Sequence, residues 1–552
     1  MLLTEKELKD IILSQNLLDE KSFQELSEFA QNSNISLTDA LIEKNIISDE
    51  KLGELIAKSL SIPFIKLANV VIPEEVLKII PEKIAKKQKI IPFEENDHVK
   101  VAMVYPKKKE ILDLISQKTG KPIIPYLITE RDFFNTLHVY RKDLQKIFDN
   151  LMTREKIEAP VAKMVDLIIE SAYQDKASDI HIEPEEKRSL VRFRIDGILH
   201  DVIVIPKDLH DRIITKIKIL SKLRTDEHFS PQDGKIQFHL VEETIDIRVS
   251  IIPIADGEKG VLRLLASHYQ QLTLRDLGMK DIDLQKSTSA AYKPYGMILS
   301  TGPTGSGKTT TIYSILHILN TREKNITTIE DPIEYRIKGV NQIQANPKAN
   351  LTFASGLRSI LRQDPNIIFV GEIRDAETAG IAVNAALTGH LVLSTLHTND
   401  AATALPRLID MKVEPFLVAS TVNIIIAQRL IRKICEVCKT ESSISREELI
   451  KNLPEEIVTR NLGEAQDFKI YEGAGCKLCH ETGYIGRIGL FEVLSVTKEI
   501  RKLITEKKDS DVIAKFAQSQ GMTTMLDDGL EKVARGITTI EEVLRVTKVE
   551  SA

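Results

Sequence analysis

The residues best suited to chemistry in this sequence form a phosphate-binding motif at 300–311, which reads STGPTGSGKTTT. The spacing is that of a P-loop, G-x-x-x-x-G-K-[ST], here placed between an apolar run and a predicted helix. Glycines let backbone N–H groups curl around phosphate oxygens, while Lys308 reaches the β- and γ-phosphates and Thr309 coordinates Mg²⁺. We therefore predict that ATP and Mg²⁺ bind at Gly302, Pro303, Thr304, Gly305, Ser306, Gly307, Lys308, Thr309 and Thr310. The alternative is an accidental glycine-rich turn.

Two further apolar runs end in acidic residues. IIFVGEIRDAET (367–378) leads into Gly371-Glu372, where many P-loop ATPases have Asp-Glu, and TTIEDPIEY (327–335) supplies Glu330, Asp331 and Glu334. If both runs are strands of one parallel sheet, their carboxyl ends open on the same edge as the phosphate loop. We then expect Glu372 to orient the attacking water, and the other three acids to organise the hydration shell of Mg²⁺. The alternative for 330–334 is a helix-capping acidic cluster.

The run TGHLVLSTLHTNDA (388–401) places a histidine at each end of a predicted strand. Seven strand residues span about 23 Å, so His390 and His397 cannot share one γ-phosphate. His397, at the carboxyl end, is the candidate phosphate sensor. For His390 a structural role and a link to a neighbouring loop both stay open.

All four cysteines of the chain fall into the pattern C-x2-C-x37-C-x2-C, formed by Cys435, Cys438, Cys476 and Cys479. In a reducing cytosol such a set indicates a tetrathiolate zinc site before it indicates disulfides. A closed four-thiolate site is structural and has no open position for catalysis. We expect the neighbouring His480 to remain a bystander.

Composition narrows the classes of protein. The chain is 42% hydrophobic and 28% charged, with net charge −5, which is ordinary for globular domains and argues against a generally basic nucleic-acid binder. No uncharged run reaches the ~18 residues of a membrane span, and MLLTEKELKD does not resemble a signal peptide. We expect a cytosolic protein, or one attached to a membrane only through a partner.

The surrounding elements follow from repeats and periodicity. Residues 8–26 and 37–55 form a weak repeat, each copy a helix, a turn at Asn16 or Asn45, and a second helix capped by Asp19 or Ser48. Alternating strands at 189–205 and 234–257 flank a predicted helix at 209–223. From 271 onward, β/α alternation predicts a mostly parallel sheet.

The predicted fold class is α/β, with a RecA-like P-loop core preceded by a smaller α+β domain and an N-terminal helical and mixed domain. The expected order is an N-terminal docking domain at 1–140, a linker at 141–159, the small α+β domain at 160–270, the ATPase domain at 271–429, the tetracysteine segment at 430–495 and a helical region at 496–552.

Taken together, the P-loop, TTIEDPIEY, LRQDPNIIFVGEIRDAETA and the two-histidine strand resemble the ATPases of type II secretion and type IV pilus assembly. The resemblance covers about residues 160–552 strongly and the N-terminal region more loosely. In that family the Walker B strand ends in Gly-Glu, and acids of the TTIEDPIEY type assist with the metal. The cysteine pattern is similar to that of the pilus extension and secretion ATPases of this family. The pilus retraction ATPases lack this pattern.

The resemblance also implies a homohexamer in which the small domain offers arginines to the nucleotide. Candidates are Arg192, Arg194, Arg248 and Arg263, and we favour the last three as a group. Relatives often have paired arginines before PQDG, but this chain has His228-Phe229 there, so an arginine role at that position is not transferable. The N-terminal repeat resembles a module that docks such ATPases to their membrane platform. It has neither the arginine nor the glycines of the cyclic-di-GMP motif, and we do not expect it to bind that dinucleotide.

The resemblance implies a cytoplasmic hexamer that hydrolyses ATP to extend type IV pili, peripheral at the inner membrane through an inner-membrane platform protein. The alternative within the family is a type II secretion motor that assembles a pseudopilus. From other classes, a nucleic-acid translocase or conjugation ATPase would need a basic or aromatic strip, whereas this chain has no Trp and nearly balanced charge. We expect no nucleic-acid partner. A nucleotide-binding scaffold without turnover is disfavoured by the intact Lys308, Thr309 and Glu372.

Overall fold

The structure is a computed structural model that describes residues 4–15, 17–33, 36–44, 46–67, 70, 72–136, 144–154, 161–240, 244–265 and 272–547. Its contacts form two compact units, one of residues 1–2 with 57–270 and one of residues 3–56 with 271–552. Among the described residues, no helix is long and apolar enough to cross a membrane. The division into domains at 140 and 160 stays a prediction.

The helical repeat at the N-terminus has the predicted form. Each copy is a helix pair, α1 (Glu5–Ser14) with α2 (Glu20–Ser33) and α3 (Leu37–Glu43) with α4 (Asp49–Leu60). The expected caps are confirmed, since Asp19 accepts the N–H of Ser22 at 2.8 Å and Ser48 accepts that of Lys51 at 3.3 Å. The turn residues Asn16 and Asn45 lie outside the described residues.

The first part of the 57–270 unit is built around a small three-stranded sheet of order β1-β2-β3. Strands β1 and β2 pair antiparallel and β3 lies parallel to β2, with apolar clusters on both faces. Its elements are α5 (Glu74–Leu77), α6 (Glu82–Gln88), β1 (Ile90–Glu95), β2 (Val99–Met103), α7 (Lys109–Thr119), β3 (Ile123–Leu127) and α8 (Glu130–Thr136).

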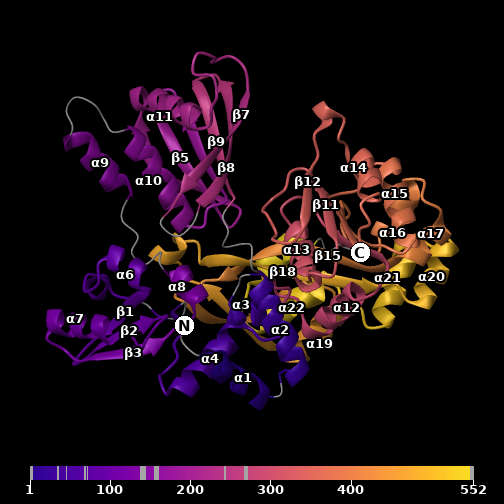
Figure 1. Cartoon of the computed structure of the whole chain (residues 1–552), viewed down its shortest axis with the longest axis horizontal. Coiled ribbons are helices and arrows are strands. Elements are labelled where there is room, and N and C mark those ends of the chain that lie inside the picture. Colours follow the sequence, from indigo (N-terminus) through magenta and orange to yellow (C-terminus); the bar gives the residue numbers. More distant parts are fainter. Residues whose placement is uncertain are drawn as a thin grey trace. The chain divides into compact units, whose positions relative to one another are not determined.

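The same unit contains a six-stranded sheet of order β6-β5-β4-β9-β8-β7, with every neighbouring pair antiparallel (Figure 1). Apolar residues alternate along its strands and pack against helices α10 and α11 on one face, which leaves charged side chains on the other. The strands and the helix predicted at 189–257 are confirmed. The elements are α10 (Val161–Gln174), β4 (Asp179–Pro184), β5 (Arg188–Ile195), β6 (Ile198–Pro206), α11 (Lys207–Leu220), β7 (Gln232–His239), β8 (Thr244–Ile254) and β9 (Gly257–Leu265).

Within the segment predicted as a linker, the described residues 144–154 are helical. They form α9 (Leu144–Arg154), whose Leu144 and Phe148 are buried in the core of the six-stranded sheet. Gln145 binds both backbone groups of Val204 at the sheet edge, at 2.9 and 3.3 Å. This part of the segment is therefore packed against β6, because its apolar face has a core to join.

The phosphate-binding motif follows the central strand β10 of a seven-stranded sheet of order β12-β11-β13-β14-β10-β15-β18. All neighbouring pairs are parallel except β15 with β18, and the central strands are buried along their whole length. This confirms the mostly parallel sheet. Its strands are β10 (Gly296–Thr301), β11 (Ile326–Glu330), β12 (Asn341–Gln344), β13 (Ile367–Val370), β14 (Leu391–Leu396), β15 (Val422–Ile434) and β18 (Tyr484–Ser495).

Helices pack on both faces of this sheet, in two separate apolar clusters (Figure 1). Helix α12 (Asp281–Ala291) precedes β10, and the helices between the strands from β10 to β15 are α13 (Lys308–Leu319), α14 (Phe353–Ile360), α15 (Ala376–Leu387), α16 (Ala404–Asp410) and α17 (Pro415–Thr421). Burial on both faces is what the continuous apolar runs of the parallel strands require.

The tetracysteine segment is an insertion between β15 and β18. Strand β16 (Lys439–Ser445) pairs antiparallel with β17 (Asp467–Gly473), with α18 (Arg446–Ile450) and α19 (Glu455–Leu462) between them. The helical C-terminal region is confirmed over its described part as α20 (Lys498–Thr505), α21 (Ser510–Ser519), α22 (Met525–Ala534) and α23 (Ile540–Val546).

The segment SHYQQLTLRDLG (267–278), between the small domain and the ATPase domain, has no rigid element recognisable from its sequence, which predicts a hinge there. The structure describes this segment only from residue 272 onward. From there, Thr273 and Asp276 close a turn through hydrogen bonds of 2.8 to 3.2 Å, and Leu274 is fully buried. Residues 272–278 are thus fastened to the core of the P-loop unit. The remainder of the predicted hinge lies outside the described residues.

Candidate functional site

The phosphate loop connects the carboxyl end of β10 to the amino end of α13. Three of its glycines have positive φ, at 148° for Gly302, 78° for Gly305 and 89° for Gly307, a backbone conformation that favours glycine. A Cβ on Gly302 would lie 2.5 Å from the carbonyl oxygen of Gln428. The loop thus needs glycine both for its curvature and for the close approach of β15.

Lys308 opens α13 and bends back over the loop. Its Nζ donates to the carbonyl oxygens of Gly302 and Pro303 at 2.8 and 3.0 Å, and the residue is 8% exposed. Burial lowers the pKa of Lys308; the Glu372 charge opposes this shift, and the Arg429 charge adds to it. The ammonium lies at a helix N-terminus, where backbone N–H groups and the helix dipole favour an anion.

Glu372 follows β13 at the same edge of the sheet. Its Oε2 lies 2.6 Å from Nε of Arg374 and 3.4 Å from Nε2 of His397, and its side chain is 12% exposed. The structure therefore brings together three of the predicted site residues, Lys308, Glu372 and His397. The structure adds Arg374, a residue of IIFVGEIRDAET to which the sequence analysis assigned no role.

The two histidines lie in different surroundings, as their separation along the strand predicts. His397 begins the loop after β14, and the next residue, Thr398, donates its N–H to Thr301 Oγ1 at 3.0 Å, just before the phosphate loop. His390 Nδ1 lies 3.0 Å from the carbonyl oxygen of Ala385 in α15, at the other end of the strand. This contact matches the structural role left open for His390.

The three acids after β11 do not share one environment. Glu330 is 2% exposed, and its carboxylate accepts hydrogen bonds from Tyr313, from Thr328 at 2.5 Å and from Gln342 at 3.2 Å. Burial raises the pKa of Glu330, and these hydrogen bonds oppose the shift. Glu330 thus fastens β11 to α13 through Tyr313. Asp331 is exposed and Glu334 half-buried, so these two are the more accessible to a hydrated Mg²⁺ ion.

Strand β15 contributes two polar residues that our sequence reasoning missed. Gln428 is 1% exposed, and its Nε2 donates to the carbonyl oxygen of Ser306 at 2.6 Å. Arg429 donates to the carbonyl oxygen of Asn399 at 2.9 Å, and so binds the loop that begins with His397. The signal for both was the interruption of the apolar run TVNIIIAQRLI by Gln and Arg. A polar residue inside a buried strand needs a partner.

The candidate arginines lie on the charged face of the six-stranded sheet. In strand register Arg194 is opposite Asp179, Asp179 is opposite Arg263, and Arg263 is opposite Arg248. Arg192 lies two residues before Arg194 in β5, and its guanidinium pairs with the Glu183 carboxylate at 2.8 Å. The three favoured arginines thus form one row across neighbouring strands, which sequence spacing alone does not reveal.

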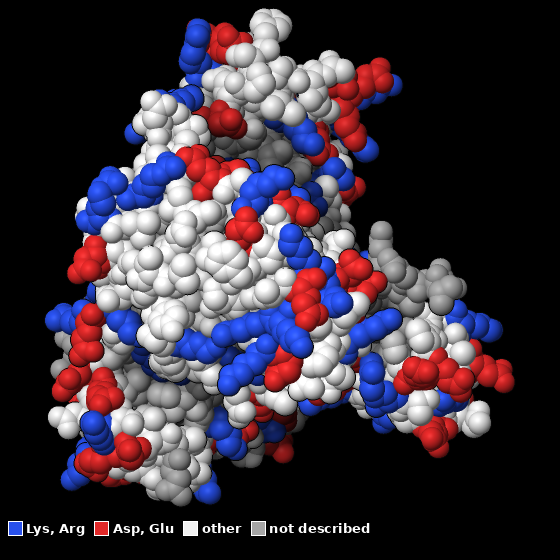
Figure 2. Space-filling model, turned by 90° about the vertical axis from the view of Figure 1, so that its right-hand side faces the viewer, with Lys and Arg blue, Asp and Glu red and all other residues white. Residues whose placement is uncertain are grey.

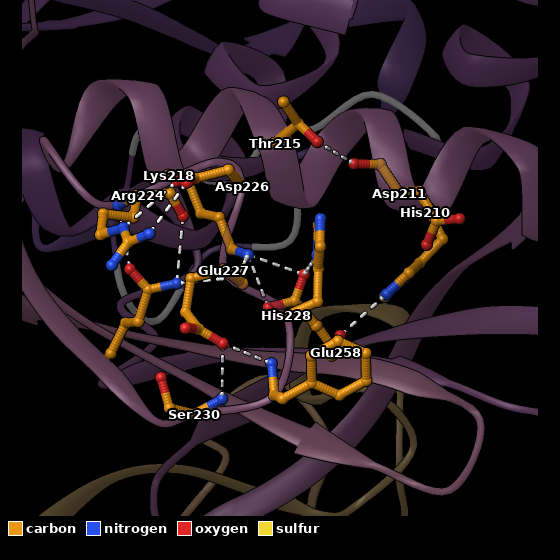
Figure 3. A network of polar contacts seen from close by, with 12 residues as sticks. His210, Asp211, Thr215, Lys218, Arg224, Asp226, Glu227, His228, Ser230 and Glu258 are labelled. Atoms are coloured by element: carbon orange, nitrogen blue, oxygen red, sulfur yellow. Dashed lines mark hydrogen bonds and ion pairs between the residues drawn. The ribbon is translucent and has the colours of Figure 1, made fainter.

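The position without the paired arginines is a loop held by polar contacts between α11 and β9 (Figure 3). Buried Lys218 contacts the Glu258 carboxylate at 2.6 Å, and His228 Nδ1 contacts it at 2.8 Å. Glu227 accepts the N–H groups of Phe229 and Ser230 at 2.8 and 3.1 Å. His228 is therefore engaged with Glu258 of β9, within the same six-stranded sheet unit.

The four cysteines converge. Their sulfur atoms all lie within 4.8 Å of one another, with Sγ–Sγ distances of 3.8 Å for Cys435–Cys476 and Cys438–Cys479 and 3.6 Å for Cys476–Cys479. Sulfurs around a tetrahedral zinc ion at ~2.3 Å lie about 3.8 Å apart, so the donor set fits Zn²⁺. The N–H groups of Cys476 and Gly483 donate to Cys479 Sγ at 3.1 and 3.2 Å, which favours a thiolate.

A family model described as Type II/IV secretion system protein matches residues 154–545, and one described as MshEN domain matches residues 60–145. The type IV pilus assembly ATPase PilB of Myxococcus xanthus is 37% identical over 562 residues, covering 97% of this chain and 98% of that protein. The type II secretion system protein E of Pseudomonas aeruginosa is 44% identical over 402 residues, covering 73% of this chain and 78% of that protein.

Among solved structures, the ATPase DotB of Legionella pneumophila superposes with a TM-score of 0.52 at 22% identity, covering 72% of this chain and 98% of that one. This likeness supports the RecA-like fold. Phosphate loop, strand-end glutamate and tetracysteine insertion thus occur together in a chain whose sequence matches these proteins over most of its length. The chain belongs to the type II/IV secretion system family of pilus assembly and secretion ATPases.

Proposed function

We propose that the protein hydrolyses ATP as a homohexamer to drive the extension of type IV pili at the cytosolic face of the inner membrane. The observation that carries the ATPase assignment is the meeting of Lys308, Glu372 and His397 at one edge of the parallel sheet, with Glu372 within 3.4 Å of His397. A phosphate-binding lysine and a strand-end carboxylate at one site are the parts that water attack on a γ-phosphate requires.

The chemistry follows from the positions of these groups. The backbone of residues 302–309 would surround the β- and γ-phosphates, with Lys308 as the counter-charge, and Thr309 would hold Mg²⁺. Glu372 orients and polarises the attacking water. Arg374 pairs with its carboxylate at 2.6 Å, and His397, 3.4 Å from the same oxygen, is placed to follow the γ-phosphate. Asp331 and Glu334 are our candidates for the hydration shell of Mg²⁺.

The arginine row supports a part for the small domain in turnover. Arg194, Arg248 and Arg263 lie on the six-stranded sheet, outside the unit that holds the phosphate loop. Guanidinium groups brought to the γ-phosphate would offset charge in the transition state. Closure of the small domain over a bound nucleotide, repeated around a hexamer, would convert hydrolysis into movement of a central membrane partner.

Pilus extension is preferred over secretion because the likeness to the pilus ATPase extends through the N-terminal region. The match to PilB covers 97% of this chain, against 73% for the secretion relative. The N-terminal region would dock an inner-membrane platform protein, so membrane association is indirect. The type II secretion motor stays the second candidate, favoured by its higher identity of 44% within the shared part. The lack of cyclic-di-GMP binding stays a prediction.

A nucleic-acid translocase finds less support. The face in Figure 2 has basic side chains lying among acidic ones around a broad area of uncharged surface. The net charge of −5 agrees with that mixture. Non-specific binding to a phosphate backbone depends mainly on clustered cations, so a mixed surface is a poor basis for it.

The decisive experiment measures Mg²⁺-dependent ATPase activity and particle mass of the full-length protein, with and without a non-hydrolysable ATP analogue. We expect a hexamer in the presence of the analogue. We also expect the ATPase rate per chain to rise with protein concentration as rings form. A strict monomer with full activity would contradict the ring mechanism. Deletion of the gene with loss of surface pili, while secretion of exoproteins continues, would separate the two machines.

A further inference from the structure

Asp179 sits at the centre of the arginine row. It begins β4, the strand between β5 and β9, and register places Arg194 on one side of it and Arg263 on the other. The residue is 5% exposed, although it lies on the charged face of the sheet. The carboxylate is therefore covered by the arginines that flank it.

Both arginines contact this carboxylate through Nε. Arg263 Nε donates to Oδ1 at 2.9 Å, and Arg194 Nε lies 3.5 Å from Oδ2. The neighbouring Ser178 hydroxyl donates to Oδ2 at 2.8 Å. Together these contacts determine the orientation of the carboxylate and, through the hydrogen bond to Nε, the direction of the Arg263 guanidinium plane. Arg194 is held in addition by its own Nη1, which donates to the carbonyl oxygen of Gly197 at 3.1 Å.

Because Arg263 contacts the carboxylate through Nε, the edge of its guanidinium formed by the two Nη groups is available for a further hydrogen-bond acceptor. The side chain of Arg263 is 60% exposed, and its two Nη groups make no hydrogen bond within the described part of the chain. A planar fork of this kind matches two oxygens of a phosphate. Without an anchor the long side chain would sample many rotamers, and ordering it on each catalytic cycle would cost entropy.

We propose that Asp179 is a positioning residue that holds Arg263 through Nε, so that the Nη edge of Arg263 stays open for a phosphate of the nucleotide. The inference rests on the proposed role of the arginines and adds the carboxylate that orients Arg263. One carboxylate between two guanidinium groups leaves a net positive charge, so the row keeps its attraction for phosphate while its geometry is set before the nucleotide arrives.

Glu183 provides a matched control on the same strand and face. Its carboxylate contacts Arg192 and Lys259, each at 2.8 Å, and its side chain is 17% exposed. The two acids thus have similar surroundings, but Glu183 contacts neither Arg194 nor Arg263. A merely structural role for a carboxylate on this face predicts similar effects of Asp179→Asn and Glu183→Gln.

The test is a double-mutant cycle in the full-length protein, with kcat and KM for ATP and the affinity for a fluorescent ADP analogue as readouts. We expect Asp179→Asn to lower kcat about 10- to 100-fold, the size of effect typical of a misplaced catalytic group. Affinity for ADP, which the phosphate loop binds, should change less than about threefold. In an Arg263→Ala background, the same Asp179→Asn change should lower kcat by less than about twofold, because the group it positions is gone.

Wild-type kcat in Asp179→Asn, equal losses in Glu183→Gln, or the same loss with and without Arg263 would each overturn the inference. Should Asp179→Asn not fold by circular dichroism, Asp179→Glu replaces it with the same expectation, since one added methylene displaces the carboxylate. The single variant Arg263→Ala separates a failure of the proposed arginine role from a failure of the proposed Asp179 role. Unchanged kcat in that variant removes the arginine role and this inference together, whereas a loss there with none in Asp179→Asn removes the inference only.

Discussion

Gln428 in β15 donates its side-chain N–H to the carbonyl oxygen of Ser306, which fastens the phosphate loop to a strand 122 residues further along the chain. The same side chain accepts a hydrogen bond from Ser300 Oγ at 3.3 Å. It therefore bridges both sides of the loop. A loop that is already curved when the nucleotide arrives binds phosphate without first having to be ordered.

Gln428→Ala should weaken nucleotide binding about tenfold, because it leaves the buried Ser306 carbonyl without its partner and frees the loop. Equilibrium titration with a fluorescent ADP analogue measures the effect. Gln428→Glu is the matched control for size. It should bind worse still, since its carboxylate would face a carbonyl oxygen in a buried position. Unchanged affinity in both variants would contradict the bridging role.

Glu372→Gln should reduce ATP turnover by about 10²-fold or more while ATP remains bound, because the amide cannot polarise the attacking water. Steady-state phosphate release and retention of labelled ATP on the protein give the two readouts. Glu377→Gln, an exposed position on the following helix, is the control and should keep its turnover. Full activity in Glu372→Gln would exclude it as the water-orienting group.

The purified protein should contain about one zinc ion per chain, and Cys435→Ser should release it. Loss of one of four thiolates opens the closed site, so residues 430–495 should become sensitive to proteolysis and the thermal midpoint should fall. Metal analysis and limited proteolysis measure these effects. His480→Ala is the control and should retain the metal. Absence of zinc, together with four thiols that titrate freely in the native protein, would refute the site.

Glu492 predicts a pH dependence of stability near neutrality. Burial raises the pKa of its carboxyl group to about 7, and the Asp400 carboxylate adds to the shift, while the Ala401 N–H and Arg429 oppose it. A pKa raised on folding contributes stability that is complete below the unfolded value of about 4.5 and is lost as pH rises through 7. The contribution is on the order of 3 kcal/mol.

Glu492→Gln keeps an acceptor for the Ala401 N–H, which Oε1 accepts at 2.9 Å, but cannot ionise. Thermal midpoints from pH 4.5 to 8 should therefore fall more steeply with rising pH in the native protein than in the variant. Glu447→Gln, at an exposed position on α18, should follow the native curve. Parallel curves for all three proteins would show that Glu492 ionises with an ordinary pKa.

The sequence by itself determined the features whose physical causes are local. Glycine spacing predicts the curved phosphate loop, alternating apolar residues predict the strands at 189–257, and polar caps such as Asp19 predict where a helix begins. The paired C-x-x-C motifs likewise predict a metal site, because the ligands within each pair are close along the chain. The family resemblance added the hexamer and the arginine candidates, which stay proposals.

Only the tertiary structure decided which distant residues meet. Glu330 and Asp331 are adjacent in sequence, yet Glu330 is buried against Tyr313 of α13 and Asp331 is exposed. Gln428 reaches the phosphate loop, and Asp179 lies between Arg194 and Arg263, through strand order and register. Register depends on how whole strands pack, and a shift by one residue would turn every side chain to the other face. Local patterns do not carry that information, so these contacts follow from the folded sheets alone.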